Sequence, residues 1–192
     1  MTVIVSIVEG DGEVRAIPIL LRRLAERQGV YDLHAPIPIR VYRDRFLNLE
    51  EEFRRKLLLA GAKAGAEGLV LVVLDADVDC PVTLAANIAA RAAAVLPHRR
   101  VAVVIANREY EAWLLAGAAS LAGKRGLPAD LAPPDAPDAI RDAKGWLSAR
   151  VSGSRYHEVS DQAALTAMLD IAAATANSRS FRKLADTVAS AL

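Results

Sequence analysis

The sequence predicts an α/β fold, a doubly wound parallel sheet with helices on both faces and a helical C-terminal extension. Apolar runs such as Val3–Val8 and Leu69–Leu74 are short, rich in β-branched residues and have no polar face, as strands buried on both sides do. These runs alternate with segments whose apolar residues recur at helical spacing. Hydrophobic residues make up 53% of the 192-residue chain, which is enough for a substantial core.

The first part of the chain alternates between strands and helices. Val14, Ile17 and Leu20 recur at helical spacing in the first helix, and Gly29 follows it as a stop signal. Pro38 cannot donate a backbone hydrogen bond, so we place the second strand at or near a sheet edge. Strands are expected at 3–8, 37–42, 69–74 and 101–105, and helices at 12–28, 49–64, 82–96 and 109–121.

The rest of the chain is expected to be a loop followed by short helices. Residues 123–137 include four prolines, which favours a loop. Short helices are expected near 139–149, 161–175 and 181–191. We therefore divide the chain into an α/β core at 1–122 and a loop-and-helix extension at 123–192, packed together as one domain.

Composition and charge exclude several classes of protein. The net charge of +1 provides no global attraction to nucleic acid or to an anionic membrane. Cys80 is the only cysteine, which excludes an internal disulfide and a Cys-based zinc site. The first strand is short and has no basic flank, so we do not expect a signal peptide. No apolar run approaches the ~20 residues of a membrane span. We expect a soluble, cytoplasmic protein that does not bind membranes.

Acidic residues directly follow two of the predicted strands. Glu9-Gly10-Asp11-Gly12-Glu13 follows the first strand, and Asp75-Ala76-Asp77-Val78-Asp79 follows the third. Ligands of parallel sheets bind beyond the carboxyl ends of the strands, so the two clusters are expected to meet there. Carboxylates gathered in one place repel one another unless a cation lies between them, and Mg²⁺ (or Mn²⁺) is the simplest such cation. We predict a metal site centred on Glu9, Asp75 and Asp77.

Each of these acidic residues also has a purely structural interpretation. Asp75 and Asp77 are two residues apart, so in an extended chain both side chains leave on the same side and can share one ion or hold a pair. A loop that starts a helix is the alternative, since Asp is common there. That alternative accounts well for Asp79, just before Pro81, and poorly for Asp75. Glu13 can stabilise a first helical turn instead. We keep Glu13 and Asp79 as candidate ligands.

A third polar segment, Asn107–Trp113, follows the fourth strand. We expect Glu109 at the same sheet edge as the two clusters. Glu111 points away from Glu109 if the helix has begun. One of the two could complete a metal shell, while the other pairs with Arg108 or caps the helix. Trp113 is expected in the core.

Positive side chains near the carboxylates would bind phosphate. Arg40 and Arg43 follow the second strand near the same edge, and Lys144 lies in the extension. Each could equally be a solvated surface charge. The three histidines lack metal-ligand spacing, and Ser6 lies inside a strand with no histidine partner indicated.

Glu9 at the end of one strand and Asp75-Ala76-Asp77 at the end of a later parallel strand resemble the Toprim domain. That domain is the catalytic module of topoisomerases, primases and the overcoming-lysogenization-defect nucleases. The blocks Val8–Glu13, Leu74–Pro81 and Ala106–Trp113, taken in order, resemble a family of small bacterial Toprim-like proteins of unknown function. The resemblance extends through Tyr156, Asp161-Gln162 and Ser180–Arg182, so it covers most of the chain.

The resemblance implies a Toprim-like fold in which Glu9 acts as general acid/base and Asp75 and Asp77 bind Mg²⁺ in phosphodiester chemistry. It also implies a companion ATPase in anti-phage operons. We therefore expect a Mg²⁺-dependent nuclease whose nucleic acid, DNA before RNA, is bound weakly by this domain alone and more tightly with the ATPase. A topoisomerase is disfavoured because no strand-gating domain fits in 192 residues.

Other functions stay open. One is phosphoryl chemistry on a small nucleotide, for which weak binding of a polyanion is no handicap. Another is a non-catalytic partner subunit that docks onto an ATPase. A receiver-type phospho-acceptor domain is disfavoured because the first strand ends in Glu9 rather than in an acidic pair, and no lysine follows a fifth strand.

Overall fold

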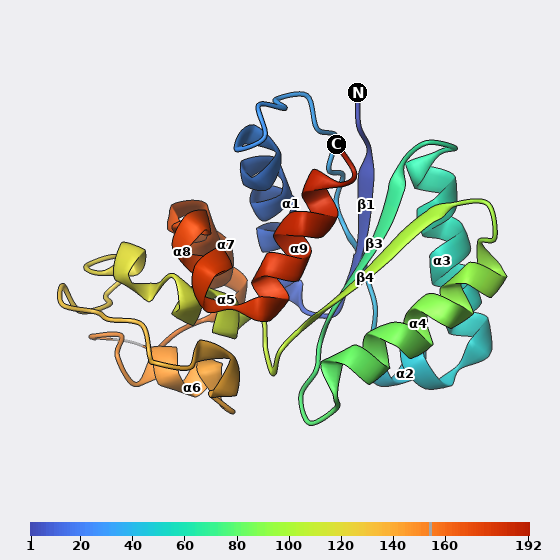
Figure 1. Ribbon diagram of the computed structural model, residues 1–192. Coiled ribbons are helices and arrows are strands. Elements are labelled where there is room, and N and C mark those ends of the chain that lie inside the picture. The colour runs from blue at the N-terminus through green and yellow to red at the C-terminus, as the bar shows by residue number, and fades with distance from the viewer. Residues whose placement is uncertain (154) are drawn as a thin grey trace.

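A computed structural model describes residues 1–153 and 155–192 and has a sheet of four parallel strands at its centre (Figure 1). The sheet order is β2-β1-β3-β4. Ile7 of β1 pairs with Ile39 of β2 on one side and with Val72 of β3 on the other, so the carboxyl ends of the strands share one edge. The strands are β1 (Ile4–Val8), β2 (Ile39–Arg40), β3 (Leu69–Asp75) and β4 (Arg100–Ala106). The predicted α/β class is confirmed.

Helices flank the sheet on both sides and also form the C-terminal part of the chain (Figure 1). They are α1 (Asp11–Glu26), α2 (Arg43–Asn48), α3 (Glu50–Ala64), α4 (Pro81–Val95), α5 (Glu111–Ala116), α6 (Ala143–Ser148), α7 (Glu158–Met168), α8 (Ile171–Asn177) and α9 (Arg179–Ala189). Two short 3₁₀ turns lie at Ala118–Leu121 and Pro137–Ala139.

The element boundaries differ from the sequence prediction in several places. The helix expected at 109–121 is the shorter α5 followed by a 3₁₀ turn at Ala118–Leu121, and the helix expected near 139–149 is limited to α6. The second strand keeps its edge position but is only two residues long, as expected where proline removes a backbone donor. The helix expected at 161–175 is two helices, since the Asp170 side chain accepts from the N–H groups of Ala172 and Ala173 and caps the start of α8. The short helix α2 was not predicted.

Each face of the sheet has its own hydrophobic core. On one side, Phe46 and Phe53 from α2 and α3 pack with strand residues such as Val72. On the other side, Trp113 and Phe181 are fully buried among residues of α1, α5 and α7 to α9. The expectation that Trp113 is a core residue is confirmed. Its indole Nε1 donates to Ser180 Oγ at 2.8 Å, which ties α5 to the start of α9.

The strand order creates a topological switch point between β1 and β3. From β1 the chain passes through α1 to β2 on one side, and later strands are added on the other side of β1 through β3 and β4. Connections leaving in opposite directions open a crevice at the carboxyl ends of the two central strands, where ligands of such sheets bind. Glu9 follows β1 and Asp75 ends β3, so both lie at this crevice.

The C-terminal helices pack closely on the core. Helix α7 lies against α1, where Gly12 allows a close approach, and Arg23 Nη1 of α1 donates to the Thr166 carbonyl at 2.7 Å. The Tyr110 hydroxyl and Thr166 Oγ1 are 2.9 Å apart within the core. Residues of the extension are thereby brought to the carboxyl edge of the sheet.

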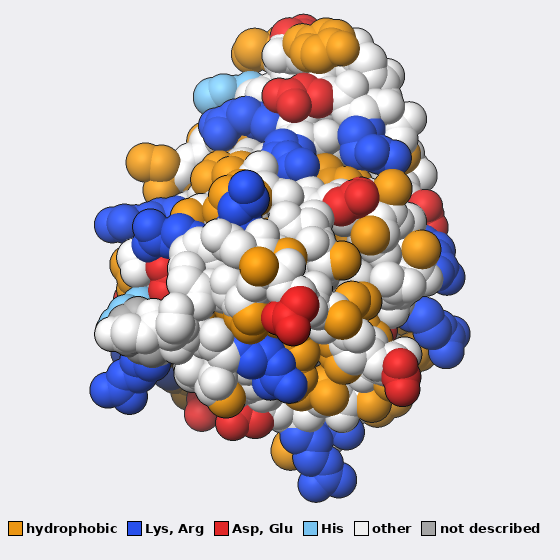
Figure 2. Space-filling view, turned by 90° about the vertical axis from the view of Figure 1, so that its left-hand side faces the viewer, with side chains coloured by type: hydrophobic (Ala, Val, Ile, Leu, Met, Phe, Trp, Pro, Cys, Tyr) orange, Lys and Arg blue, Asp and Glu red, His pale blue; other side chains and the backbone are white. Residues whose placement is uncertain are grey.

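Charges are dispersed over the surface. On the face seen in Figure 2, Lys and Arg side chains alternate with acidic and hydrophobic ones, in keeping with the net charge of +1. None of the helices in the described part of the chain combines the length and the apolar character that crossing a membrane requires.

The close contact at Gly12 gives a test of this packing. A methyl group there would come within 2.5 Å of Gln162 Oε1 and 2.8 Å of the Glu158 carbonyl oxygen. We expect Gly12→Ala to lower the free energy of unfolding by roughly 1–2 kcal/mol, because the overpacking cost exceeds the gain in helix propensity. Arg15→Ala, on the exposed side of the same helix, should change it by less than about 0.5 kcal/mol. Urea denaturation measures both, and equal stability of the two variants would contradict the packing.

Candidate functional site

A polar pocket of about 580 Å³ opens at the carboxyl ends of β1 and β3. It brings together acidic and basic side chains that are far apart in the sequence. Most of the predicted site residues line it. Its lining consists of Glu9, Gly10, Glu13, Arg40, Val41, Tyr42, Arg43, Asp44, Arg45, Asp75, Asp77, Lys144 and Glu158.

Glu9 and Asp75 each have a buried carboxylate oxygen for which the described residues 1–153 and 155–192 provide no hydrogen-bond partner. These atoms are Glu9 Oε2 and Asp75 Oδ1. Asp75, the last residue of β3, is 7% exposed, so water does not solvate this carboxylate freely. A buried charged oxygen without a partner is costly, and a proton or a bound cation removes the cost. Glu9 and Asp75, at the switch point, are therefore placed to bind a proton or a cation.

Two further carboxylates are buried next to them. Glu13 Oε2 accepts from the backbone N–H groups of Glu9 and Gly10, each at 2.9 Å, so Glu13 does cap the first turn of α1. Glu111 is fully buried at the start of α5, and its Oε1 accepts from the Tyr156 hydroxyl at 2.8 Å and from Gln162 Nε2 at 3.1 Å. Glu111 Oε2 and Gln162 Oε1 have no partner. The cluster of Glu9, Glu13, Asp75 and Glu111 is hereafter the acidic cluster.

Asp77 and Asp79 are placed differently from the expectation. The chain does not stay extended after Asp75, because Asp77 adopts a left-handed conformation with φ of 50°. Its side chain is 50% exposed and lies on the pocket wall, with Oδ2 at 3.7 Å from Arg43 Nε. Asp79 forms a close ion pair with Arg43. Asp75 is thus buried at the pocket, whereas Asp77 is half exposed on its wall. Asp79 is held by Arg43.

Neither Glu109 nor Glu111 is among the residues that line the pocket, so which of them could complete a metal shell stays a prediction. Glu109 Oε2 accepts from the backbone N–H of Lys144 at 3.1 Å, at the start of α6. The charge on Glu111 raises the pKa of Asp75. Glu109 therefore positions the segment that carries Lys144.

All three predicted phosphate-binding residues line the pocket, and each is already paired. Arg40 Nε lies 3.0 Å from Asp11 Oδ1. Arg43 Nε donates to the Asp75 carbonyl at 3.3 Å. Lys144 Nζ lies 3.1 Å from Oε2 of Glu158, the first residue of α7. A phosphate group entering the pocket would compete with these carboxylates for the cations.

Burial and mutual repulsion shift the acidic cluster toward the protonated state. Burial raises the pKa of Asp75 well above its usual range, and the carboxylates of Glu13, Glu111 and Glu9 raise it further. Burial also raises the pKa of Glu13 to about 7, although two backbone N–H groups oppose the rise. The pKa of Glu9 is raised by burial and by Asp77, and that of Glu111 by burial. Such perturbed carboxyls in one pocket are typical of functional sites.

The unpartnered oxygens fit a hard cation that takes few protein ligands. Mg²⁺ is commonly held by one or two carboxylates, with water and substrate phosphate as the other ligands. Glu9 and Asp75 offer two such carboxylates on the pocket wall, whereas Glu111 is buried and does not line the pocket. Among the residues that the structure describes, no three His, Cys, Asp or Glu side chains are arranged to hold a metal ion as they stand. Metal binding therefore stays a prediction.

Three residues at or beside the pocket were not singled out from the sequence: Glu158, Gln162 and Tyr42. Glu158 and Gln162 come from α7, and only its packing on α1 brings them near Glu9. The resemblance to Toprim-like proteins includes Gln162 but not Glu158, so no signal in the sequence pointed to Glu158. Tyr42 lies beside Arg43 in the sequence and showed no pattern of its own. The positions of these residues depend on how distant segments of the chain pack together, which the local sequence pattern does not predict.

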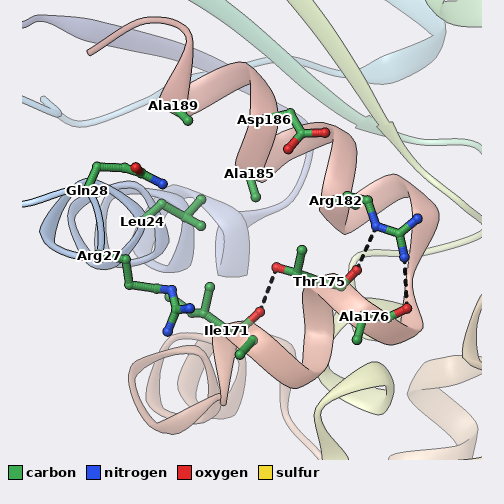
Figure 3. A pocket seen from close by; sticks show the side chains of 11 residues that line it. Leu24, Arg27, Gln28, Ile171, Thr175, Ala176, Arg182, Ala185, Asp186 and Ala189 are labelled. Carbon is green, nitrogen blue, oxygen red and sulfur yellow. Dashed lines mark hydrogen bonds between the residues drawn. The ribbon is translucent and has the colours of Figure 1, made fainter.

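A second hollow, of about 380 Å³, lies between α1, α8 and α9 (Figure 3). Its lining is largely aliphatic, including Leu24 and Ile171. The Arg182 guanidinium at its side donates to the carbonyls of Thr175 and Ala176. None of its lining residues has a buried polar side-chain atom that lacks a partner, as far as the structure describes the chain. The pocket with the acidic cluster is the better candidate.

Comparison with known proteins identifies the family of this chain. Residues 8–189 match the family described as Domain of unknown function (DUF4276), and the chain belongs to that family. Searches of curated proteins and of solved structures returned no match. The family match assigns no activity, and the resemblance to Toprim remains a prediction.

The raised pKa values predict how stability depends on pH. The ordinary pKa of a glutamate is 4.5, and that of Glu13 is about 7 in the folded protein. Between these values the folded chain binds more protons than the unfolded chain, so the free energy of unfolding falls as pH rises. Without divalent cations we expect the Tm at pH 5 to exceed that at pH 8 by roughly 5–10 °C.

The Glu13→Gln variant tests the origin of this dependence. The amide oxygen can still accept from the backbone N–H groups of Glu9 and Gly10 but has no proton to lose. The fall in Tm between pH 5 and 8 should therefore be smaller than in the wild type. Thermal denaturation followed by circular dichroism measures both proteins, and a wild-type Tm that rises over this range would contradict the shifted pKa values.

Proposed function

We propose that the protein is a Mg²⁺-dependent phosphodiesterase of the Toprim-like, nuclease type, with the polar pocket as its active site. The observation that carries this proposal is the pair of unpartnered buried oxygens, Glu9 Oε2 and Asp75 Oδ1, at the switch point of a parallel sheet. The same pocket contains Arg43 and Lys144, which suit a phosphate group. Phosphoryl chemistry uses carboxylates that bind a metal ion together with positive side chains that bind the phosphate. This pocket contains both kinds of group.

The chain's own residues divide the work as follows. Glu9 and Asp75 would hold the cation, and Asp77 lies at the outer wall of the pocket. The bound metal would stabilise negative charge on the phosphate oxygens. Glu9, whose pKa is raised by burial and by Asp77, takes a proton from the attacking water. The new P–O bond forms as the bond between phosphorus and the leaving oxygen breaks, and the leaving oxygen takes up a proton from the protonated Glu9 or from solvent water.

Lys144 and Arg43 orient the phosphate. Burial alone would lower the pKa of Lys144, but Glu111 and Glu158 outweigh it and raise that pKa, so the ammonium group keeps its charge. A phosphate bound by Lys144 would compete with the ion pair that Lys144 forms with Glu158. Positioning by fixed charges is the main contribution proteins make to this chemistry.

A small nucleotide is the second candidate substrate. The pocket volume of about 580 Å³ lies within the range of small-molecule sites, and the net charge of +1 gives little attraction to a long polyanion. For a polymer substrate, we propose that a partner ATPase supplies the additional affinity. The comparison of polymer and mononucleotide substrates separates these two cases.

The activity is tested by incubating supercoiled plasmid, single-stranded oligonucleotides and nucleotides with the protein and Mg²⁺ or Mn²⁺. We expect Glu9→Gln and Asp75→Asn each to lower the rate by about 10²–10⁴-fold, because each loses a group that acts on the proton or the cation. Asp130→Asn, an exposed carboxylate elsewhere, should retain the wild-type rate. Wild-type protein that cleaves none of these substrates, with and without a neighbouring ATPase and ATP, would contradict the proposal.

Cation binding has a readout that does not depend on activity. At pH 8 the carboxylates of the acidic cluster repel one another, and a cation bound between them would reduce this repulsion. Because the cation binds only the folded state, it raises the stability of that state by mass action. We expect 10 mM Mg²⁺ to raise the wild-type Tm by on the order of 5–10 °C if its Kd is about 0.1 mM. The Asp75→Asn variant should show little of this rise, and the Asp130→Asn variant all of it. An equal rise in all three proteins would indicate a nonspecific salt effect.

A further inference from the structure

Tyr42 is an exposed aromatic side chain on the wall of the polar pocket. It is 62% exposed, whereas the large aromatic residues Trp113, Tyr110 and Phe46 are fully buried. Tyr42 comes two residues after the end of the short edge strand and lies between Arg40 and Arg43 in the sequence, and all three residues line the pocket. Nothing in the packing of the core accounts for an aromatic ring at this place.

The backbone of Tyr42 is fixed on both sides. The N–H of Val41, which is 2% exposed, donates to the Val8 carbonyl at 2.8 Å and continues the pairing of β2 with β1. The Tyr42 carbonyl accepts from the N–H of Phe46 at 2.8 Å, which starts α2. The ring therefore projects from a rigid point of the sheet edge.

One face of the ring is supported by a cation. The Arg40 guanidinium carbon lies over the ring, 5.0 Å from its centroid. Arg40 is itself held by Asp11 in the first turn of α1, at 3.0 Å. The guanidinium is attracted to the π-face of the ring, and this contact restrains rotation of the Tyr42 side chain. The exposure of 62% leaves the remainder of the ring open to a ligand.

We infer that Tyr42, backed by Arg40, is the stacking platform for one unpaired nucleobase of the substrate, whose phosphate lies against Arg43 and Lys144. This inference rests on the proposed function and deepens it by naming the substrate class, a single-stranded nucleic acid or a free nucleotide. In a duplex both faces of a base are covered by its neighbours, so only an unpaired base can lie on the ring.

The size and charge of the site agree with a single nucleotide. The pocket holds about 580 Å³ and cannot enclose a duplex. Its cations come from one short segment, Arg40 to Arg45, and from Lys144, rather than from the broad basic surface that duplex binding uses. Stacking is tolerant of sequence, since every base has a π-face, so we expect little base preference.

Binding measurements test this inference in the full chain. In an Asp75→Asn background, which keeps the ligand intact, we compare Tyr42 with Tyr42→Ala and Tyr42→Trp by fluorescence anisotropy of a labelled eight-nucleotide single strand. Stacking on an aromatic side chain is worth about 1–3 kcal/mol per base, which predicts a roughly 5- to 150-fold weaker Kd for Tyr42→Ala. Tyr42→Trp should bind at least as tightly as the parent. Tyr31→Ala is the matched control, because Tyr31 is 82% exposed and does not line the pocket.

Two further binding measurements show whether the stacked base belongs to a nucleic-acid strand or to a free nucleotide. A duplex of the same sequence should lose less than about 3-fold in affinity on Tyr42→Ala. Adenosine monophosphate is added as a competitor. Displacement that depends on Tyr42 would support a free nucleotide as the ligand, and its failure to compete would support the polymer.

Several outcomes would overturn the inference. These are equal binding by Tyr42 and Tyr42→Ala, an equal loss for the duplex, a loss in Tyr42→Trp as large as in Tyr42→Ala, and no binding of strand or nucleotide by the parent. Cleavage by wild-type protein together with binding that is independent of Tyr42 would overturn the platform and leave the phosphodiesterase in place. Binding that depends on Tyr42 without cleavage by wild-type protein would do the reverse.

Discussion

Burial of several carboxylates at one edge of the sheet is the constraint on which the rest of the structure depends. Asp75 ends a strand whose residues are all buried, so its position leaves little access to water. Glu13 and Glu111 are almost fully enclosed as well. Moving one unpaired carboxylate from water into a protein interior costs several kcal/mol, and neighbouring carboxylates increase the cost. The surrounding groups can be understood as partial offsets to this cost.

The offsets come from every part of the chain. Backbone N–H groups of the first turn of α1 bind Glu13, and two side chains of the extension, Tyr156 and Gln162, bind Glu111. Lys144 brings a positive charge from the start of α6. Even so, within the described part of the chain one oxygen of Glu9, one of Asp75 and one of Glu111 stay without partners. Buried polar atoms in proteins nearly always have a hydrogen-bond partner, so these oxygens are the structural argument for a proton or a cation at this place.

The sequence was sufficient for the parts of this arrangement that depend on local pattern. Short β-branched runs followed by acids predicted both the parallel sheet and the place of Glu9 and Asp75 at one edge, because strand ends in a parallel sheet coincide. The left-handed turn at Asp77 was not predicted, since aspartate is compatible with extended and left-handed conformations alike. The strand order, and with it the switch point, was also beyond local pattern. So were the roles of Glu111, Glu158 and Gln162, because they depend on how α5 and α7 pack.

Arg43 shows why a residue of such a site rarely has one role. Its guanidinium binds the Asp75 carbonyl and pairs with Asp79, and Nε lies 3.7 Å from Asp77 Oδ2. The loop after β3 is also fixed by Arg108, since the Asp77 N–H donates to the Arg108 carbonyl at 3.0 Å and Arg108 Nη1 donates to the Asp77 carbonyl at 2.9 Å.

Asp77 and Arg108 both have positive φ, 50° and 70°, a conformation that costs non-glycine residues energy and persists only where its surroundings fix it. Removing Arg43 would therefore release a strained loop at the same time as it removed a charge from the pocket. Lys144 lines the pocket without holding this loop, so its loss would remove a phosphate-binding charge without releasing the strained loop, although it would also remove an offset to the charge of the acidic cluster.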